Sequence, residues 1–175
     1  MGLGVTQILV GVSNLITNKN IKWSLPHAMM TLLIFFTQIQ EWWITYSYSM
    51  EVTEWSLPLV MLLMVYPILL FVAARVLFPY EEIENKAVDM EEYFWKKWPA
   101  VYTIFFLIAL TSILQNSLFS GIPISEQILQ ILVAGAYLIF VVTRVSNRLI
   151  HILFLGIQLI VWIGYLFVEE QTIQV

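Results

Sequence analysis

A single glutamate stands in the middle of a strongly apolar stretch, in the sequence TQIQEWWITYSYS at residues 37–49. In a helix, Gln38 and Thr45 would share a face with Glu41, because residues three or four positions apart lie next to each other. A carboxylate costs about 2.5–3.5 kcal/mol at the centre of a membrane-spanning helix, so it normally faces a partner or a water-filled cavity. Glu41 is therefore the first candidate for a functional group.

Other uncharged polar side chains are expected at a similar depth in neighbouring helices, counting about 1.5 Å per residue. We predict that these groups converge on an outward-facing polar cavity around Glu41, which would hold an ion or a small polar ligand. In the alternative interpretation, Glu41 reaches the outer surface or the amides link the helices by hydrogen bonds. The predicted ligand-binding set is Glu41, Gln38, Gln115, Asn116, Gln127 and Gln130.

Two histidines form a second candidate site. His27 and His151 are each expected about one turn into a helix that starts on the same side of the protein. Two imidazoles on facing helices can ligate a haem, which makes an intramembrane redox protein the most distant of the alternatives. The competing interpretation is structural, with His151 near Arg148 or a lipid phosphate. We therefore expect no cofactor and no metal site.

Known catalytic motifs are missing from the sequence. It contains no H-E-x-x-H, no G-x-S-x-G and no phosphate-binding glycine loop. There is no cysteine, which excludes thiolate metal sites and cysteine nucleophiles. A basic patch for nucleic acid is also absent. The sequence thus favours a protein that is not an enzyme and has no nucleic-acid partner.

The composition indicates the class of fold that must position these groups. The chain has 175 residues, of which 60% are hydrophobic and 11% are charged, whereas soluble domains carry about 25% charged residues. The excess apolar surface must face lipid or a large partner. We predict an all-α polytopic membrane protein in which residues 1–175 form a single transmembrane domain, an antiparallel bundle of six transmembrane helices. The expected segments are 2–17, 24–47, 55–78, 98–117, 124–144 and 148–168, the first of which is the shortest.

Prolines and polar caps suggest where the helices begin and end. Pro67 falls in the middle of the third segment, where it should kink the helix and free a carbonyl near residue 63. A proline in a first turn removes no hydrogen bond, and serine or asparagine caps helix starts. The expected boundary markers are Pro26, Pro58 and Pro99 in first turns, Phe78 and Pro79 as a stop, and Ser125 and Asn147 as caps.

The basic residues indicate an orientation. All of them fall in or beside the loops after the first, third and fifth segments, and the alternate loops and the C-terminal tail contain none. Because cytoplasmic loops concentrate Lys and Arg, we predict that these three loops are cytoplasmic and that the C-terminus lies outside. The basic residues are Lys19, Lys22, Arg75, Lys86, Lys96, Lys97, Arg144 and Arg148.

Aromatic residues beside lysines suit the headgroup layer of a bilayer. The polar loop YEEIENKAVDMEEYFWKKW ends in such a cluster, and a tryptophan pair follows Glu41 at the opposite side. We expect these groups to be interfacial anchors, and binding of anionic lipid is the alternative for the loop. The predicted anchors are Trp42, Trp43, Trp95, Trp98, Lys96 and Lys97.

Several stretches resemble, in this order and spacing, a group of uncharacterised bacterial multi-pass membrane proteins: GVTQILVGVSNLI, QEWW, YP at Pro67, LFP at Pro79 and EEYFWKKW. The resemblance covers residues 3–98. Its most specific parts are the tryptophan pair, Phe78 with Pro79, and Tyr93 with Phe94 before two lysines. The group has no established activity, so the resemblance implies a multi-pass protein of the bacterial inner (plasma) membrane and no particular chemistry.

Two functions follow as hypotheses. The first is a channel, transporter or sensor for an ion or a small polar ligand, with Glu41 central. The second is a structural or accessory membrane subunit. Gly4 and Gly11 share one helical face, which indicates close helix packing or self-association. The expected partners are therefore the lipid bilayer and either a second copy of the chain or another membrane protein.

Overall fold

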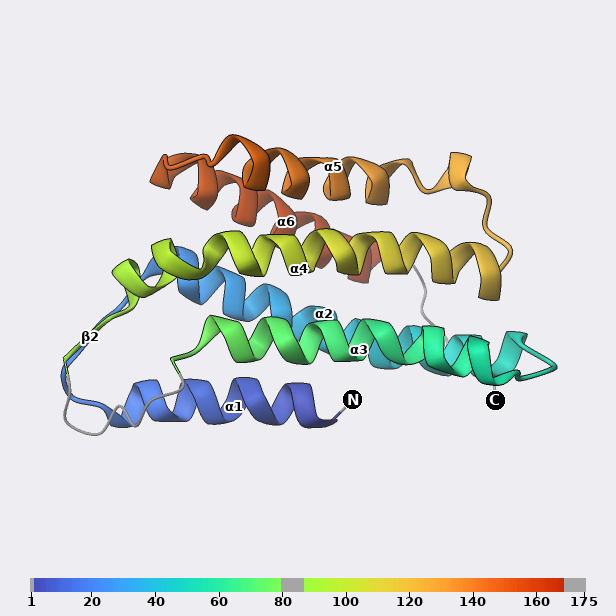
Figure 1. Cartoon of the computed structure of the whole chain (residues 1–175), viewed down its shortest axis with the longest axis horizontal. Coiled ribbons are helices and arrows are strands. Elements are labelled where there is room, and N and C mark those ends of the chain that lie inside the picture. The colour runs from blue at the N-terminus through green and yellow to red at the C-terminus, as the bar shows by residue number, and fades with distance from the viewer. Residues whose placement is uncertain (1, 80–86, 169–175) are drawn as a thin grey trace.

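The computed structural model describes residues 2–79 and 87–168 of the chain (Figure 1). The all-α prediction is confirmed, because the described residues form six α-helices with only two short strands and one 3-10 turn. The helices are α1 (Gly2–Thr17), α2 (Leu25–Glu51), α3 (Leu57–Leu77), α4 (Met90–Phe119), α5 (Ile128–Thr143) and α6 (Arg148–Val168). The other elements are β1 (Ile21–Lys22), β2 (Val88–Asp89) and the 3-10 turn η1 (Ile124–Glu126).

The helices form two layers. In Figure 1, α1, α3, α4 and α5 lie in a row, and α2 and α6 cross behind them. Extensive contacts join α1 to α3, α3 to α4 and α4 to α5, while α2 packs on α3, α4 and α6. The layers are held by a buried apolar core whose main members are Met30, Ile34, Leu70, Leu77, Phe94 and Val101.

The outer surface of the bundle is largely apolar. Large aliphatic side chains on both layers are exposed, whereas soluble monomers rarely show apolar patches of more than a few hundred Å². By length and composition, α3 and α4 could each cross a membrane, and α1, α5 and residues 148–164 of α6 form shorter apolar helices. Exposed apolar residues on different helices include Leu3, Leu9, Leu57, Met61, Leu118, Leu132, Val142, Leu153 and Ile160.

Several predicted boundaries are confirmed. Helices α1 and α6 have the expected bounds, and Pro26 and Pro58 lie in the first turns of α2 and α3. Phe78 ends α3. Asn147 caps α6, since the Leu149 backbone N–H donates to its Oδ1 over 2.9 Å. These boundaries rest on local backbone chemistry, which the sequence shows directly.

The prediction that the fourth helix begins near residue 98 was wrong. Helix α4 begins at Met90, and Pro99 lies inside it rather than in its first turn. Asp89 caps the helix by accepting hydrogen bonds from the Glu91 and Glu92 backbone N–H groups at 2.9 and 3.1 Å. With this cap the helix starts early and continues through the proline, so most of the aromatic and lysine cluster is helical rather than loop.

Two other boundaries also differ from the prediction. Ser125 does not cap α5, because residues 124–126 form the 3-10 turn η1 and α5 starts at Ile128 after Gln127. Helix α2 continues to Glu51, beyond the expected end at residue 47. In both places the apolar pattern indicated the helix but not the residue at which it begins or ends.

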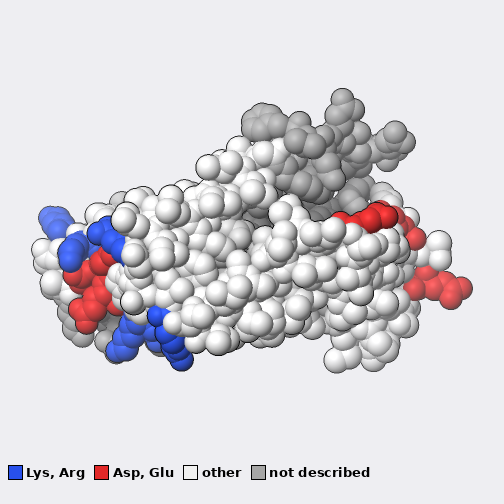
Figure 2. Space-filling model, turned by 90° about the horizontal axis from the view of Figure 1, so that it is seen from above, with Lys and Arg blue, Asp and Glu red and all other residues white. Residues whose placement is uncertain are grey.

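A short parallel pairing joins two loops at one end of the bundle. Strand β1 pairs with β2, with Ile21 opposite Val88 and Lys22 opposite Asp89. The Lys22 ammonium donates to Asp89 Oδ2 over 2.7 Å, which lowers the pKa of the carboxyl and raises the pKa of the lysine. Figure 2 shows the Lys and Arg side chains gathered at this end, which is the basic end of the bundle. The same carboxylate therefore starts α4 and fixes the loop after α1.

Removal of Asp89 should separate these two roles. Asp89→Ala loses the cap and the ion pair, whereas Asp89→Asn keeps a capping oxygen, so thermal melts should rank wild type above Asp89→Asn and Asp89→Ala lowest. Because the folded pKa of Asp89 is lowered, its contribution is present above the unfolded pKa of about 3.9 and is lost as the pH falls through the folded value. The difference in thermal midpoint between wild type and Asp89→Asn should therefore disappear in acid. A difference in midpoint that does not change with pH would contradict the role of the ion pair.

Glycines let α1 approach its neighbours closely. Gly11 faces the ring of Phe78 and Gly4 faces the end of the Gln38 side chain, and a Cβ at either position would overlap these groups. Gly11→Ala should lower the unfolding free energy by about 1–3 kcal/mol because the Phe78 ring must move. Gly4→Ala should cost less, since the Gln38 amide can turn away. Gly135→Ala, which meets nothing within 4 Å, is the control for denaturant unfolding in detergent. Equal effects at the three positions would contradict the close packing.

Candidate functional site

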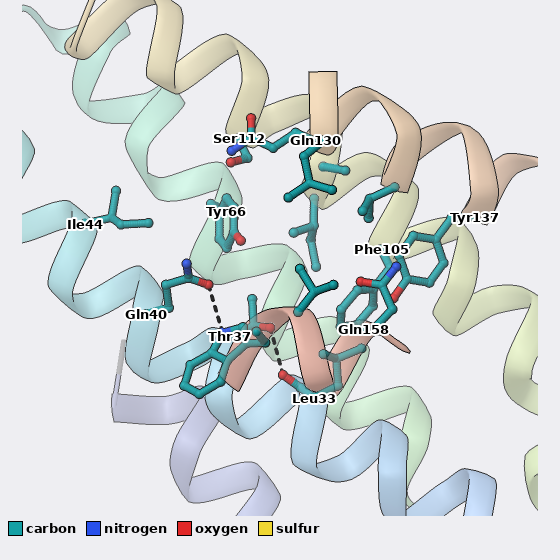
Figure 3. A pocket seen from close by; sticks show the side chains of 16 residues that line it. Leu33, Thr37, Gln40, Ile44, Tyr66, Phe105, Ser112, Gln130, Tyr137 and Gln158 are labelled. Atoms are coloured by element: carbon teal, nitrogen blue, oxygen red, sulfur yellow. Dashed lines mark hydrogen bonds between the residues drawn. The ribbon is translucent and has the colours of Figure 1, made fainter. Parts of the chain in front are cut away.

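A cavity of about 220 Å³ lies inside the bundle and is lined by every helix from α2 to α6 (Figure 3). Its apolar lining consists of Leu33, Ile44, Phe105, Ile108, Ala109, Leu129, Val133, Val161 and Trp162. Its polar lining consists of Thr37, Gln40, Tyr66, Ser112, Gln130, Tyr137 and Gln158. All of these polar side chains are amides or hydroxyls, so none of the described residues in the cavity wall is charged.

The polar side chains form a belt to which each of the five helices contributes. Gln40 comes from α2, Tyr66 from α3, Ser112 from α4, Gln130 from α5 and Gln158 from α6. Gln40 and Gln130 both lie roughly 20 Å along their helices from the basic end, and Gln158 lies about 15 Å along α6. Figure 3 shows these labelled side chains around the same space. The arrangement presents hydrogen-bonding groups from several directions at one level.

An aromatic layer closes the cavity toward the basic end. Tyr137 and Phe105 line the cavity with ring centroids 5.3 Å apart, and Tyr137 also packs edge-on against Phe154 and Tyr102. Phe140 stacks on Phe154 at 4.5 Å. These adjoining rings therefore lie between the cavity and the basic end of the bundle.

The Tyr137 hydroxyl is a buried polar group without a hydrogen-bond partner among the described residues. Its side chain is almost fully buried, and it lines the cavity. Buried polar atoms in proteins are nearly always paired, and an unpaired one costs about 1–3 kcal/mol. The Tyr137 side chain thus places an unsatisfied polar group next to the cavity.

Trp162 fixes α6 against α2 beside the cavity. Its indole Nε1 donates to Gln40 Oε1 over 3.0 Å, and its ring stacks on Phe36 at 4.6 Å. The hydrogen bond is drawn as a dashed line in Figure 3. Because Trp162 and Gln40 both line the cavity, this contact holds one wall in place.

Of the predicted set, the structure brings Asn116, Gln127 and Gln130 together. Asn116 Nδ2 donates to Gln127 Oε1 at 3.3 Å and to Gln130 Oε1 at 3.2 Å. The Tyr48 hydroxyl donates to Asn116 Oδ1 at 2.6 Å, and Gln127 Nε2 donates to the Ser117 hydroxyl at 2.8 Å. This network links α2, α4 and α5 on the side of the cavity that is away from the basic end. Only Gln130 belongs both to the network and to the cavity wall.

Gln115 points to α3 instead of the cavity. Its Nε2 lies 2.9 Å from the Leu62 carbonyl oxygen and 3.5 Å from that of Leu63. Pro67 lies inside α3 and has no N–H to offer Leu63, four residues earlier. The carbonyl predicted to be free near residue 63 thus has a donor from the neighbouring helix.

Glu41 and Gln38 are buried on another face of α2 and do not line the cavity. Glu41 is 2% exposed and accepts a hydrogen bond from the Thr45 hydroxyl at 3.2 Å. Gln38 packs against Gly4 of α1, and its Nε2 has no partner among the described residues. Glu41 is therefore not central to this cavity. The next residue back, Gln40, is turned by about 100° around the helix and faces it instead.

The histidines do not share a site. His27 Nε2 lies 3.0 Å from the Leu77 carbonyl oxygen, and its ring packs edge-on against Phe78. His151 Nε2 lies 2.9 Å from the Val145 carbonyl and Nδ1 lies 3.0 Å from the Tyr102 hydroxyl. A carbonyl can only accept, so Nε2 of His151 carries the proton and its Nδ1 accepts from the tyrosine. Both nitrogens of His151 are engaged, and the two rings have no common neighbour among these contacts.

The predicted anchors are placed differently from one another. Trp42 and Lys96 are exposed, while Trp43, Trp95 and Lys97 are half-buried. Trp95 donates from Nε1 to Glu91 Oε1 at 3.0 Å, and Glu91 also pairs with Arg148 at 3.3 Å. Trp98 is buried against His151, with ring centroids 4.7 Å apart. Trp98 is thus part of the core rather than an interfacial anchor.

Sequence reasoning missed most of the cavity wall. Gln40 stands beside the more conspicuous Glu41, and Gln158 is the single amide in the apolar stretch LFLGIQLIVW. Both would have been found by treating every lone polar residue in an apolar segment as a candidate. Tyr66, Ser112 and Tyr137 carry no such signal, because tyrosine and serine are common on helix faces of every kind.

Comparison with protein-family models, with curated proteins and with solved structures found no match for this chain. The resemblance to bacterial multi-pass membrane proteins therefore stays a prediction. Function is therefore inferred from the cavity and its surroundings.

A double-mutant cycle tests the contact between Gln115 and the proline-interrupted helix. Gln115→Leu should lower the unfolding free energy by about 1–3 kcal/mol, because it leaves a buried carbonyl without a donor. In a Pro67→Ala background the restored N–H can pair with Leu63, so the same substitution should cost clearly less. Denaturant unfolding of the four proteins measures the coupling. Additive effects would mean that Gln115 does not serve the carbonyls freed by Pro67.

Proposed function

We propose that this chain is a multi-pass membrane protein that binds a small uncharged ligand in the cavity lined by the five helices α2 to α6. The observation that carries the proposal is the belt of amide and hydroxyl side chains that five helices contribute to one cavity, whose described lining carries no charge. Ligand sites in proteins are typically apolar cavities with a few convergent polar groups, often between the helices of a bundle. The protein would bind or sense its ligand and is not proposed to be an enzyme.

The apolar periphery supports a place in the membrane. Exposed aliphatic side chains surround the helices, and the charged side chains in Figure 2 lie toward the ends of the molecule. This distribution matches a bundle whose middle faces hydrocarbon and whose ends face water. We further propose that all six helices cross or enter the plasma membrane, with the loops after α1, α3 and α5 on the cytoplasmic side and the C-terminus outside.

The chemistry of the wall favours an uncharged ligand over an ion. Moving a charge into an apolar interior is costly unless an opposite charge pairs with it, and no lining residue in the described part of the chain supplies one. The volume of about 220 Å³ exceeds the roughly 150 Å³ of an engineered cavity that holds benzene. A neutral molecule with one ring or a short chain and a hydroxyl or carbonyl group would fit both features.

The aromatic layer between the cavity and the basic end favours ligand binding over continuous conduction. Tyr137, Phe105 and Phe154 lie across the direction that a solute would have to follow to the basic end. Transport would require these rings to separate. Binding at a closed-ended cavity needs no such movement, so it is the activity that the arrangement supports best.

Benzyl alcohol is a suitable probe because it is neutral, small and carries a hydroxyl group. It should raise the thermal midpoint of the purified protein in phosphatidylcholine nanodiscs relative to Ala109→Phe, in which a ring fills the cavity. Ala100→Phe, exposed on the same helix, is the matched control and should respond as the wild type does. Equal responses of wild type and Ala109→Phe would overturn the proposal, whereas a purely structural subunit predicts that equality.

Tyr137→Phe separates a ligand role from a structural role. Without a partner in the described residues, the hydroxyl contributes no hydrogen bond to the fold, so its loss should leave the ligand-free midpoint unchanged or raised. The benzyl alcohol response should weaken at the same time. A lower ligand-free midpoint together with an unchanged response would show that the hydroxyl serves the fold and not a ligand.

A further inference from the structure

Helices α5 and α6 are consecutive in the chain and contact each other near the turn that joins them, where Phe140 and Tyr137 pack on Phe154. They are joined through residues 144–147, and in Figure 1 they leave this turn in different directions. Helix α5 packs along α4, whereas α6 crosses to α2, and the two are not among the helix pairs with extended contacts in the described residues. The seam between α5 and α6 is the stretch beyond these ring contacts, away from the turn, where Leu129 and Val161 border the cavity.

The exposed part of the cavity wall lies on this seam. Leu129 of α5 is 58% exposed and Val161 of α6 is 41% exposed, and both line the cavity. The opposite wall, with Leu33, Phe105 and Ile108, is buried. Counting from the basic end, both rim residues lie roughly 20 Å along their helices, at the level of the polar belt. The opening is thus in the side of the bundle and not at its end.

The flanks of the seam are apolar as well. Leu132 follows Leu129 by one turn on α5, and Ile157 precedes Val161 by one turn on α6, and both are exposed. A molecule that reaches the cavity by this side passes aliphatic side chains first and hydroxyl or amide groups afterwards. This order suits a ligand that has a neutral polar head and hydrocarbon chains.

We propose that the ligand is a neutral lipid of the diacylglycerol type, which enters from the hydrocarbon through the seam between α5 and α6. This inference rests on the proposed function, since it names the ligand of the same cavity. The glycerol hydroxyl and the first ester lie in the polar belt, and the Tyr137 hydroxyl hydrogen-bonds the head. The chains stay in the seam between Leu129 and Val161.

The lack of charge in the described cavity lining and the volume of the cavity both favour a neutral lipid. A phosphate or ammonium headgroup would lie in a wall whose described side chains are all uncharged, which disfavours ordinary phospholipids. The volume of about 220 Å³ is below the roughly 300–1,000 Å³ of sites that enclose whole drug-sized ligands. Only a head can therefore be enclosed, and a long-chain ligand must leave its chains outside, as the open seam allows.

The test compares two lipids with the same chains. Dioleoylglycerol and dioleoylphosphatidic acid are added at equal mole fraction to the protein in phosphatidylcholine nanodiscs, and the thermal midpoint is measured. Dioleoylglycerol should raise the midpoint by about 5 °C near saturation, and the phosphatidic acid should not. Ala109→Phe should abolish the shift and Ala100→Phe should retain it.

The seam itself is tested by a bulky side chain at its rim. Val161→Trp should reduce the dioleoylglycerol shift at least threefold, while Val142→Trp, exposed on α5 away from the cavity, should leave it unchanged. If Val161→Trp does not fold, Leu129→Trp replaces it. Equal shifts in the rim and control variants would overturn the lateral route.

The outcomes separate this inference from the proposed function. A shift with benzyl alcohol but none with dioleoylglycerol would overturn the lipid inference and leave a small-molecule site standing. Equal shifts with dioleoylglycerol and dioleoylphosphatidic acid would show recognition of chains alone and would also overturn it. No shift with either benzyl alcohol or dioleoylglycerol would overturn both proposals.

Discussion

The structure depends on one constraint, which is that polar groups inside a bundle with an apolar periphery must find partners within the protein. Hydrocarbon offers no hydrogen bonds, so each unmatched amide or carbonyl in such a setting is costly. The described residues meet this demand by contacts between helices. Gln115 serves the carbonyls beside Pro67, Asn116 joins Gln127 to Gln130, and His151 uses both ring nitrogens. These contacts determine which helices are neighbours as much as the apolar core does.

Among the described residues this matching is incomplete at two buried atoms, Gln38 Nε2 beside α1 and the Tyr137 hydroxyl at the cavity. Around it, amide and hydroxyl groups from five helices face a shared space, and the Tyr137 hydroxyl has no partner in the described part of the chain. Charge is kept elsewhere, since Lys22 pairs with Asp89 and Arg148 with Glu91 at the basic end. Glu41, the residue that first suggested a site, is buried among other contacts. The described lining of the cavity is therefore polar but uncharged, which explains why we favour a neutral ligand.

How far the sequence predicts this molecule depends on whether a feature is local. The bounds of α1 and α6, the first-turn positions of Pro26 and Pro58 and the Asn147 cap depend on neighbouring residues and were predicted correctly. The early start of α4 was missed because Asp89 was not recognised as a cap, and its partner Lys22 lies far away in the sequence. Counting residues placed Gln130 and Asn116 at a common level, but it could not say which face of α2 turns inward. The sequence therefore suggested Glu41 as the cavity residue, whereas the structure has the adjacent Gln40 in the cavity wall. The packing of α2 against its neighbours determines which of the two faces the cavity.

The central claim is that the exposed aliphatic faces of α5 and α6 contact lipid hydrocarbon. The chain has no cysteine, so nitroxide labels can be introduced at single positions in protein reconstituted into bilayers. Labels at Leu132, Ile139, Ile157 and Ile160 should be accessible to dissolved oxygen and shielded from a water-soluble nickel complex, in contrast to a label at Lys19. Nickel accessibility at the four helix positions as high as at Lys19 would contradict the account, because the apolar faces would then lie in water or in a wet interface.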